Sequence, residues 1–431
     1  MDGWRSTKQS GWPMFDFLNL AKIAVRNIRR YRRRSLLTIS LIAFGVVFVL
    51  VFVAVSSSFK NLMIRQITDS YLGDLQIHRR GYVASIETLP LNLNLAPQQA
   101  ANAAKVLQEN PDISSFSERI KFGAMFSNFT ETTNIRINGV TPESEFATCP
   151  QMSARISDGD KSVNALQKGK ILVPALLARG MRSKVGDTVV IIATNKEGSV
   201  NGKTLVVSGI LESATGPGGR DGYIHIDDAM EILRMGQREI SEFAISLKNP
   251  ERVDAVAATV TAALGAIVKD PKKAPFQVHT WAELSPFANI ARMVDLMTVF
   301  VKVMLIAIVL ISILNVMIMA VYERVREIGT IAAIGTLPGK IRSLFLVEGL
   351  FLGVAGALVG LVASLVIILG IHLWKFSFNF GQATGLILEP TIDASQIAIA
   401  CFMVIGVSVV ASLQPAFKAS RMEPIDALRH V

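Results

Sequence analysis

The chain has 431 residues, of which 51% are hydrophobic and only 18% charged. Soluble domains usually carry about 25% charged residues, so this composition argues against a soluble globular protein, and the high apolar content excludes a disordered one. The formal net charge is +10, but seven of these charges lie in residues 1–35. A broad basic surface is therefore excluded, and nucleic acid is not an expected partner.

Residues 1–35 are predicted to form a basic, amphipathic N-terminal helix on the cytoplasmic side of a membrane. Its arginines directly precede an uncharged apolar run, and Lys and Arg concentrate on the cytoplasmic side of membrane proteins. The predicted topology anchors are Arg29, Arg30, Arg32, Arg33 and Arg34. A cleaved signal peptide is excluded, because the basic region starts too late and the apolar run is too long.

Four runs of the chain are long and apolar enough to cross a bilayer, which takes about 20 residues. The predicted spans are 36–57, 291–321, 343–373 and 397–413. The loop 322–342 contains four Lys or Arg and is expected inside, whereas the loop 374–396 contains one and is expected outside. Both termini, including the tail 414–431, are then cytoplasmic.

The residues 58–290 are expected to form a large α+β domain outside the membrane, inserted between the first and second transmembrane helices. Strands are predicted at 75–79, 135–140, 187–193, 204–211, 223–226 and 243–247, and helices at 97–109, 227–235 and 250–264. Asp227 is a candidate N-cap of the middle helix. Two subdomains are expected, without a placed boundary. Helical spacing at both ends predicts stalks that continue the first two spans, and helices lying on the lipid headgroups are the alternative.

No cluster of residues predicts an enzyme active site. The five His are scattered, and Cys149 and Cys401 lie in different predicted regions, so neither a metal site nor an internal disulfide is expected. The Gly-Lys-Thr that begins at Gly202 lacks the first glycine of a nucleotide-binding loop, because Glu197 stands there. The chain itself is expected to bind no metal or cofactor and to hydrolyse no ATP.

The inner loop 322–342 and the third span both carry patterns that a passive membrane anchor would not need. The loop combines charged residues with closely spaced apolar ones, as in a short amphipathic helix that inserts into a partner's groove, and a helix that only connects two spans is the alternative. The candidate coupling residues are Glu323, Arg324, Arg326, Glu327, Ile328, Gly329, Ala333, Ile334 and Gly335. In the third span, one helical face carries Gly349, Gly353, Gly356 and Gly360. Such small residues allow close helix packing, either within the chain or at a dimer seam.

Three membrane-side segments resemble the MacB/FtsX superfamily of ABC transporter permeases, the type VII permeases. They are residues 20–46 with their Arg-rich centre, residues 323–349 with the Glu-Ile-Gly and Ala-Ile-Gly sequences, and the closing segment 414–429. Two weaker external matches are Val-Gly-Asp-Thr-Val from 185 and Val-Ser-Gly-Ile-Leu from 207. The resemblance therefore covers nearly the whole chain.

The resemblance implies a permease that works by mechanotransmission in a bacterial inner membrane. A cytoplasmic dimer of ABC ATPases on separate chains would bind ATP and Mg and move the inner loop, and the first two spans would pass this motion to the external domains. The resemblance implies three other partners. They are a second permease subunit, which is identical or homologous, membrane lipids, and a periplasmic chaperone or adaptor. No ATPase domain is expected ahead of the first span, because only 35 residues precede it.

Among the branches of this family, the lipoprotein-releasing (Lol-type) permeases fit the layout best, with lipoproteins or similar amphiphiles as substrates. The alternative within the family is a separate-chain efflux permease similar to the macrolide exporters. Two further alternatives are a membrane adaptor that regulates an external hydrolase and a sensor that works without an ATPase. The stretch 213–222 includes Gly216, Pro217, Gly218 and Gly219. It is a candidate loop for recruiting a chaperone, and a plain strand connection is the alternative.

Overall fold

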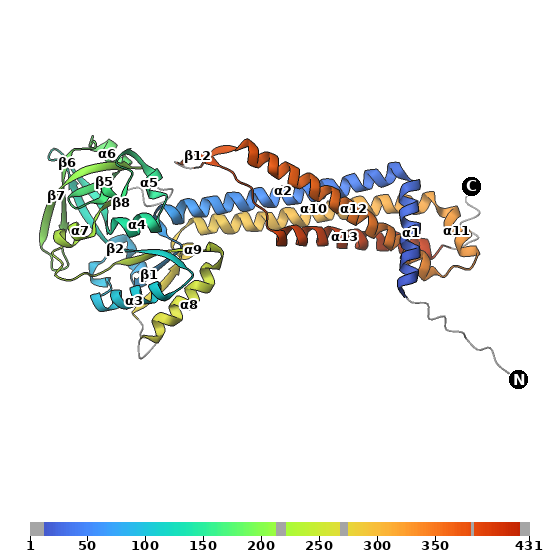
Figure 1. Cartoon of the computed structure of the whole chain (residues 1–431), viewed down its shortest axis with the longest axis horizontal. Helices are drawn as coiled ribbons and strands as arrows, with labels where there is room; N and C mark the ends of the chain where they lie inside the picture. Colours follow the sequence, from blue (N-terminus) through green and yellow to red (C-terminus); the bar gives the residue numbers. More distant parts are fainter. Residues whose placement is uncertain (1–12, 213–220, 268–274, 381–382, 423–431) are drawn as a thin grey trace. The chain divides into compact units, whose positions relative to one another are not determined.

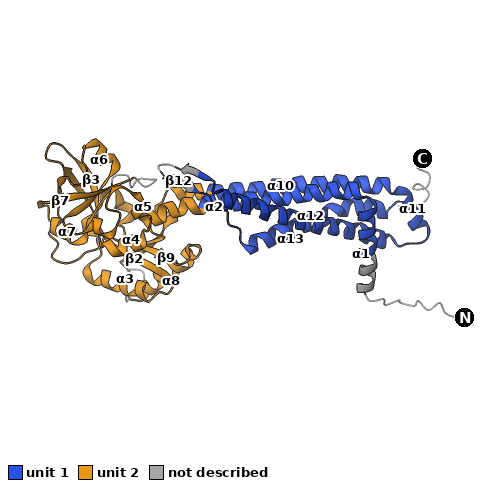
Figure 2. Cartoon of the chain, turned by 45° about the horizontal axis from the view of Figure 1, so that its top comes forward, with its two compact units in different colours: residues 1–60, 293–377, 387–431 blue, residues 61–292, 378–386 orange. Residues whose placement is uncertain are grey.

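The computed structural model describes residues 13–212, 221–267, 275–380 and 383–422 (Figure 1). The candidate loop at Gly216, Pro217, Gly218 and Gly219 lies outside these residues. The chain divides into two compact units (Figure 2). A helical unit contains residues 1–60, 293–377 and 387–431, and a second unit contains residues 61–292 and 378–386.

The helical unit is built from long apolar helices. Within the described ranges, four helices are long and apolar enough to cross a membrane, and each contains one of the predicted spans. The helices of this unit are α1 (Pro13–Arg30), α2 (Arg32–Ile67), α10 (Phe287–Glu323), α11 (Val325–Ala333), α12 (Pro338–Trp374) and α13 (Ala394–Ser420). The 36 residues of α2 correspond to about 54 Å at 1.5 Å per residue, against a hydrocarbon core of about 30 Å. The helix therefore runs without interruption through its predicted stalk.

The four glycines of the third span lie in α12 and face two neighbouring helices of the same chain. An added Cβ at Gly349 or Gly353 would lie 1.9 or 2.7 Å from the nearest atoms of Ser412 and Ser408 in α13. The same addition at Gly356 or Gly360 would lie 2.5 or 2.6 Å from atoms of α2. Close backbone approach of this kind is what small residues provide where dispersion forces hold helices together. These glycines thus pack against α13 and α2 of the same chain.

Residues 61–292 of the second unit form an α+β domain whose strands join in one mixed sheet. Among the described residues the sheet has ten strands, in the order β10-β1-β9-β2-β3-β8-β5-β7-β4, with β6 pairing with β2 and β7. The strands are β1 (Leu75–Arg79), β2 (Ile113–Ser127), β3 (Thr132–Val140), β4 (Ile156–Gly159), β5 (Lys170–Pro174), β6 (Thr188–Thr194), β7 (Val200–Leu211), β8 (Asp221–His225), β9 (Glu242–Leu247) and β10 (Phe276–Thr280). The β3–β8 and β5–β7 pairs are parallel.

Short helices cover the sheet and shape its ends. They are α3 (Pro97–Glu109), α4 (Pro142–Thr148), α5 (Met152–Arg155), α6 (Ala175–Gly180), α7 (Ile226–Ile232), α8 (Val253–Ala266) and α9 (Trp281–Leu284), with η1 (Thr68–Leu72), η2 (Val83–Thr88), η3 (Leu91–Leu93), η4 (Val163–Leu166) and η6 (Pro250–Arg252). A separate two-stranded sheet, β11 (Ser377–Phe380) and β12 (Ala383–Ile387), follows α12 in the chain. The predicted fold class, four transmembrane helices with an α+β domain after the first, is confirmed.

Several details of the domain differ from the expectations. The N-cap of α7 is His225, whose Nδ1 accepts a hydrogen bond from the backbone N–H of Asp227 at 3.1 Å, so Asp227 was the wrong cap. The long strand β2 was not predicted at all. The expected subdomains share one sheet, which carries a large hydrophobic cluster and a smaller one around Met152, Leu166 and Leu172.

Candidate functional site

The helix α11 lies between two long helices in the chain and presents an exposed apolar face. Its end is fixed by Gly335, whose φ of +93° is a left-handed conformation that favours glycine. Beyond the buried Ile328, the side chains of Ile331, Ile334 and Leu337 are exposed, and Ile334 retains 79% of its surface. Apolar side chains that remain exposed beside a polar segment are typical of a surface that another molecule covers.

Arg324 and Glu348 form a buried ion pair directly beside α11. Arg324 immediately precedes α11, and Glu348 lies in the third turn of α12. The guanidinium Nη1 of Arg324 lies 3.1 Å from Oε2 of Glu348, and the two residues are 5% and 0% exposed. A buried charge is costly unless it is paired and hydrogen-bonded, so this pair holds the start of α11 against α12.

A second arginine, Arg34 from the first turn of α2, completes the ion pairs of Glu348. Its Nη2 lies 3.0 Å from Oε1 of Glu348, and its Nη1 lies 3.4 Å from the partly exposed Glu323 at the end of α10. Each oxygen of the Glu348 carboxylate therefore accepts from a different arginine. Arg34 therefore joins α2 to α10 and to α12. Charge-assisted hydrogen bonds are about twice as strong as neutral ones, so these contacts are strong.

Tyr31, in the one-residue break between α1 and α2, lies against the arginines of this cluster. The guanidinium groups of Arg34 and Arg324 lie 5.3 and 5.6 Å from the centre of its ring, within cation–π range. Its hydroxyl donates to Oε1 of Glu327 in α11 at 3.3 Å, and Glu327 also accepts from Arg324 at 3.1 Å. Exposed Arg30 pairs with the same Glu327 at 3.3 Å.

We call these residues the basal ion cluster. It comprises Arg30, Tyr31, Arg34, Glu323, Arg324, Glu327 and Glu348. Its three arginines balance its three glutamates, so the cluster is neutral as a whole. Residues from five helical segments contribute to it. Glu327 links α11 to α1 directly, and Arg324, Glu348 and Arg34 extend the network to α12, α2 and α10.

The structure divides the predicted coupling residues between two environments. Glu323, Arg324 and Glu327 enter the basal ion cluster, while Ile328 and Gly329 are the buried residues of α11. The remaining ones lie at the surface: Arg326, Ala333, Ile334 and Gly335. Among the predicted topology anchors, Arg29, Arg30, Arg32 and Arg33 are exposed, and Arg34 is turned towards Glu348.

Sequence reasoning missed Tyr31 and Glu348 as members of a site. Glu348 could have been found, because an ionisable residue inside an apolar span is by default a functional residue with a partner. Nothing in the local sequence marks Tyr31, since its partners Glu327 and Arg324 lie about 300 residues away.

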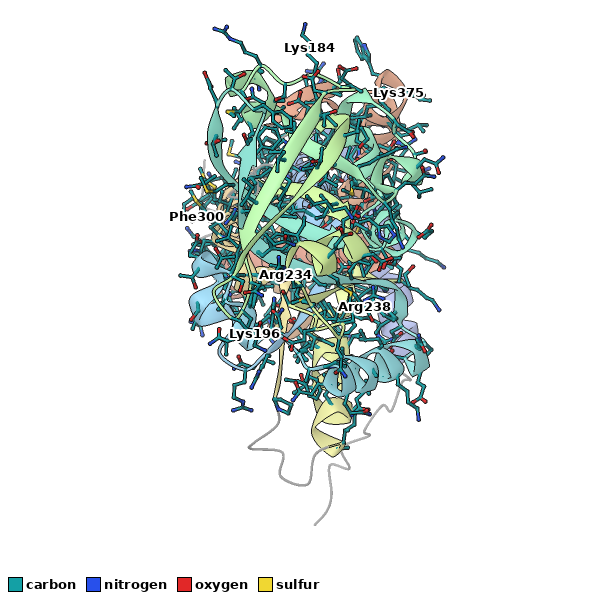
Figure 3. All side chains as sticks on the ribbon, turned by 90° about the vertical axis from the view of Figure 1, so that its left-hand side faces the viewer. Lys184, Lys196, Arg234, Arg238, Phe300 and Lys375 are labelled. Atoms are coloured by element: carbon teal, nitrogen blue, oxygen red, sulfur yellow. The ribbon has the colours of Figure 1, made fainter. Side chains whose placement is uncertain are left out.

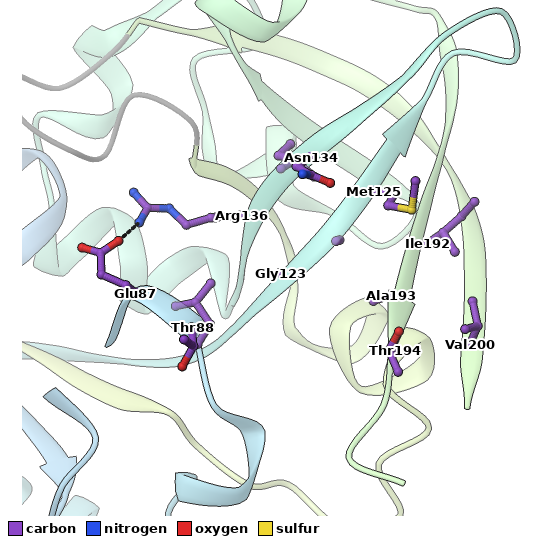
Figure 4. Close-up of a pocket in the computed structure, with 13 residues that line it drawn as sticks. Glu87, Thr88, Gly123, Met125, Asn134, Arg136, Ile192, Ala193, Thr194 and Val200 are labelled. Atoms are coloured by element: carbon purple, nitrogen blue, oxygen red, sulfur yellow. Dashed lines mark ion pairs between the residues drawn. The ribbon is translucent and has the colours of Figure 1, made fainter. Parts of the chain in front are cut away.

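The α+β domain has a surface pocket on its sheet. The pocket, of about 670 Å³, lies on the strands β2, β3, β6 and β7 beside η2 (Figure 4). Arg136 crosses it between Glu87 at 3.9 Å and Asp221 at 2.9 Å. In the described part of the chain no group of three His, Cys, Asp or Glu is placed to hold a metal ion. Lys184, Lys196, Arg234 and Arg238 are exposed on this domain (Figure 3).

Two family models match the chain, and together they cover most of it. Residues 35–263 match the MacB-like periplasmic core domain, and residues 299–424 match the FtsX-like permease C-terminal domain. The first match alone covers more than half of the chain. The α+β domain is therefore of the MacB periplasmic type, and the helices that follow it are of the FtsX type.

Similar proteins over nearly the full length are permeases. The lipoprotein-releasing system transmembrane protein LolC of Neisseria meningitidis is 23% identical over 95% of this chain and 99% of its own. The uncharacterized ABC transporter permease YknZ of Bacillus subtilis is 24% identical over 95% of this chain and 98% of its own. The crystal structure of the periplasmic region of MacB from Actinobacillus actinomycetemcomitans covers 51% of this chain and 92% of its own, with 10% identity and a TM-score of 0.37.

The two family models and the full-length permease relatives agree with the sequence resemblance in kind and in extent. Permease components of this type are multi-pass membrane proteins and are not themselves enzymes. The chain belongs to the MacB/FtsX family of ABC transporter permeases, the type VII permeases, and is similar to LolC.

Proposed function

We propose that this chain transmits the conformational changes of an ABC ATPase to its periplasmic domain by mechanotransmission. The observation that carries the proposal is the basal ion cluster, which ties the exposed helix α11 to α2, α10 and α12 through buried charges. A force applied to α11 reaches both stalk helices through these contacts. The long uninterrupted helices α2 and α10 then carry it towards the domain.

The partner at α11 is a cytoplasmic ATPase dimer on separate chains, which binds ATP and Mg. Support comes from the apolar side chains of Ile331, Ile334 and Leu337, which are exposed beside the charged segment. A second permease subunit, identical or homologous, completes the complex, and membrane lipids surround its exposed apolar helix faces. The chain itself holds no cofactor in this proposal.

The chain lies in the bacterial inner membrane with both termini in the cytoplasm and the α+β domain in the periplasm. The Lys/Arg distribution supports this orientation, because α1, α11 and the tail carry the basic residues expected on the cytoplasmic side. A periplasmic chaperone or adaptor is a further proposed partner of the domain.

The proposed substrates are lipoproteins or similar amphiphiles that are released or exported towards the outer membrane. The full-length similarity to a protein named as part of a lipoprotein-releasing system supports this choice. A separate-chain efflux permease of the macrolide-exporter kind is the second candidate, which the shorter 36% identity to macrolide export proteins favours. A lipoprotein or a small amphiphile that co-purifies with the chain would separate the two.

The decisive experiment reverses one charge of the basal ion cluster. Glu327→Lys, or Gly329→Leu on the buried side of α11, should abolish transport and uncouple it from ATP hydrolysis while the chain remains inserted in the membrane. Glu389→Lys, which makes the same charge change at an exposed position after β12, is the matched control. ATPase association and transport are measured on the complex purified in mild detergent. Survival of both in the Glu327 and Gly329 variants would refute the proposal.

A further inference from the structure

The end of the first stalk helix has an unusual conformation in the α+β domain. After Ile67 the chain continues as the π-helical turn η1, which Gly73 closes by donating its N–H to the carbonyl of Thr68 at 2.9 Å. Gly73 has a φ of +74°, and an added Cβ there would lie 2.9 Å from backbone atoms of Ile245. A helix end normally leaves its last carbonyls without a partner in the helix.

Three successive carbonyls of η1 accept hydrogen bonds from other segments of the domain. The carbonyl of Asp69 accepts from the backbone N–H of Gln151 at 3.0 Å. The carbonyl of Ser70 accepts from Nη1 of Arg155 at 2.8 Å, and that of Tyr71 accepts from Nη1 of Arg119 at 2.6 Å. The end of the stalk helix is therefore held by α5 and by the strand β2.

Both arginines are buried, at 2% exposed for Arg119 and 8% for Arg155. Arg119 is fixed by both oxygens of Glu145 in α4, at 2.9 and 2.7 Å, and by Glu242 in β9, at 3.0 Å. Arg155 also donates to the carbonyl of Glu212, at 3.1 and 2.9 Å. Two cations at the negative end of a helix dipole are a stabilising arrangement, and burial strengthens it.

The second stalk enters the domain beside the end of the first. The chain reaches α10 through β10 and α9, and the N–H of Trp281 donates to the carbonyl of Asp74 at 3.0 Å. The strand β10 pairs with β1, where Leu75 lies opposite Thr280. The two stalk helices are thus connected to neighbouring strands, α10 to β10 through α9 and α2 to β1 through η1. Side chains from β2 and α5 hold the end of α2 in addition.

We propose that Arg119 and Arg155 form a rigid joint at the end of α2, through which a rotation or displacement of this helix moves β2 and the α4–α5 segment. The two arginines are positioning residues, since they act on the main chain of η1. The joint converts a helix end, which otherwise frays, into a fixed attachment. Its members come from β2 and α5, which lie more than 40 residues from η1 in the chain.

Arg155 is the better residue for a test, because removal of Arg119 would leave Glu145 and Glu242 buried without their shared partner. Such an uncompensated charge can unfold a domain. Arg155→Met removes the hydrogen bonds to the carbonyls of Ser70 and Glu212. Because these acceptors are uncharged main-chain groups, the substitution leaves no buried carboxylate without its partner. Arg155→Lys keeps a positive charge and one donor, and should restore part of the effect.

The measurement is a distance distribution between two spin labels in the full-length chain in lipid nanodiscs. Labels at the exposed positions Asn61, in α2, and Lys161, after β4, span the joint, with Cys401→Ala to remove the partly exposed native thiol. The wild-type joint should give a narrow distribution, and Arg155→Met should broaden it at least two-fold. Arg179→Met, which removes an exposed arginine that donates to the carbonyl of Ala175 within α6, should leave it unchanged. An unchanged width in Arg155→Met, with the domain folded, would overturn the inference.

A second arm uses the complex with its co-purified ATPase, and it rests on the proposed function. In the wild type, ATP with vanadate should change the distance between labels at Ser56 in α2 and Met297 in α10, while the distance across the joint stays constant. In Arg155→Met, nucleotide should shift the distance across the joint as well. Absence of any nucleotide effect between α2 and α10 in the wild type would refute the proposed function alone. A joint distance that changes equally in wild type and variant would refute the joint.

Discussion

Glu348→Gln tests whether the basal ion cluster holds the helical unit together. The substitution keeps the size of the side chain but removes its charge and leaves one carbonyl oxygen where two carboxylate oxygens accept from Arg34 and Arg324, at 3.0 and 3.1 Å. Removing one partner of a buried ion pair typically costs about 3–5 kcal/mol. Arg34 retains Glu323 at 3.4 Å and Arg324 retains Glu327 at 3.1 Å, so the lower limit, about 3 kcal/mol, is expected.

The assay is thermal unfolding of the full-length chain in mild detergent. For units of 150–250 residues, 1 kcal/mol shifts Tm by about 2–4 °C, so Glu348→Gln should lower Tm by roughly 6–12 °C. Glu323→Gln is the matched control, because Glu323 pairs with the same Arg34 but keeps 43% of its side chain exposed. Exposed pairs contribute about 1 kcal/mol or less, so the control should shift Tm by roughly 4 °C at most.

A double-mutant cycle with Arg324→Gln then isolates the pair. The coupling energy between positions 324 and 348 should exceed about 1 kcal/mol, since neighbours in one hydrogen-bond network are not additive. Equal Tm shifts in Glu348→Gln and Glu323→Gln, together with additive effects in the cycle, would show that burial of the carboxylate is not what holds these helices.

Three further changes probe other contacts. Gly360→Ala should destabilise the helical unit by about 1–3 kcal/mol in the same unfolding assay, because its Cβ would lie 2.6 Å from Val46. Gly370→Ala is the control and should be neutral, because its Cβ meets no described atom within 4 Å. Equal effects of the two substitutions would refute close packing of α12 against α2 at Gly360. Burial raises the pKa of Asp74 to about 6, so the free energy of unfolding of the wild-type domain should fall by about 2–3 kcal/mol as pH rises from about 4 to 6. Asp74→Asn should therefore raise the Tm of the domain above about pH 6 but not below about pH 4. Fluorescence of the neighbouring Trp281 can follow this unfolding. Gly335→Ala forces a Cβ into a left-handed conformation and should speed amide exchange at the end of α11 about five-fold, whereas Gly335→Asn should change it less; equal exchange in both would contradict the cap.

The sequence predicts the membrane helices well because each carries its own signal. An uncharged run such as 36–57 needs no knowledge of its neighbours, and the helical spacing that follows it predicts the continuation of α2 to Ile67. The Ala-Ile-Gly end of α11 is also visible, since Gly335 is a typical helix C-terminal residue.

The basal ion cluster and the joint could not be predicted in this way. Their members are far apart in the chain: Arg34 lies 314 residues from Glu348, and Arg119 lies 123 from Glu242. The strand β2 escaped prediction for a related reason. Ser, Glu, Arg and Lys interrupt its apolar pattern, and Glu118 and Arg119 pair with Arg238 and Glu242 only once β9 and the loop before it lie alongside. Local pattern cannot assign such a segment.

In the proposed mechanism, the length of the two stalk helices would set the size of the movements that reach the α+β domain. A rigid helix of about 54 Å that tilts by about 5° moves its far end by about 5 Å. The hydrogen bonds of the basal ion cluster are about 3 Å long, and a shift of about 1 Å at that end is enough to weaken them. Under the proposed mechanism the chain would act as a displacement amplifier: rearrangements on the scale of one hydrogen bond would become displacements on the scale of one helical turn.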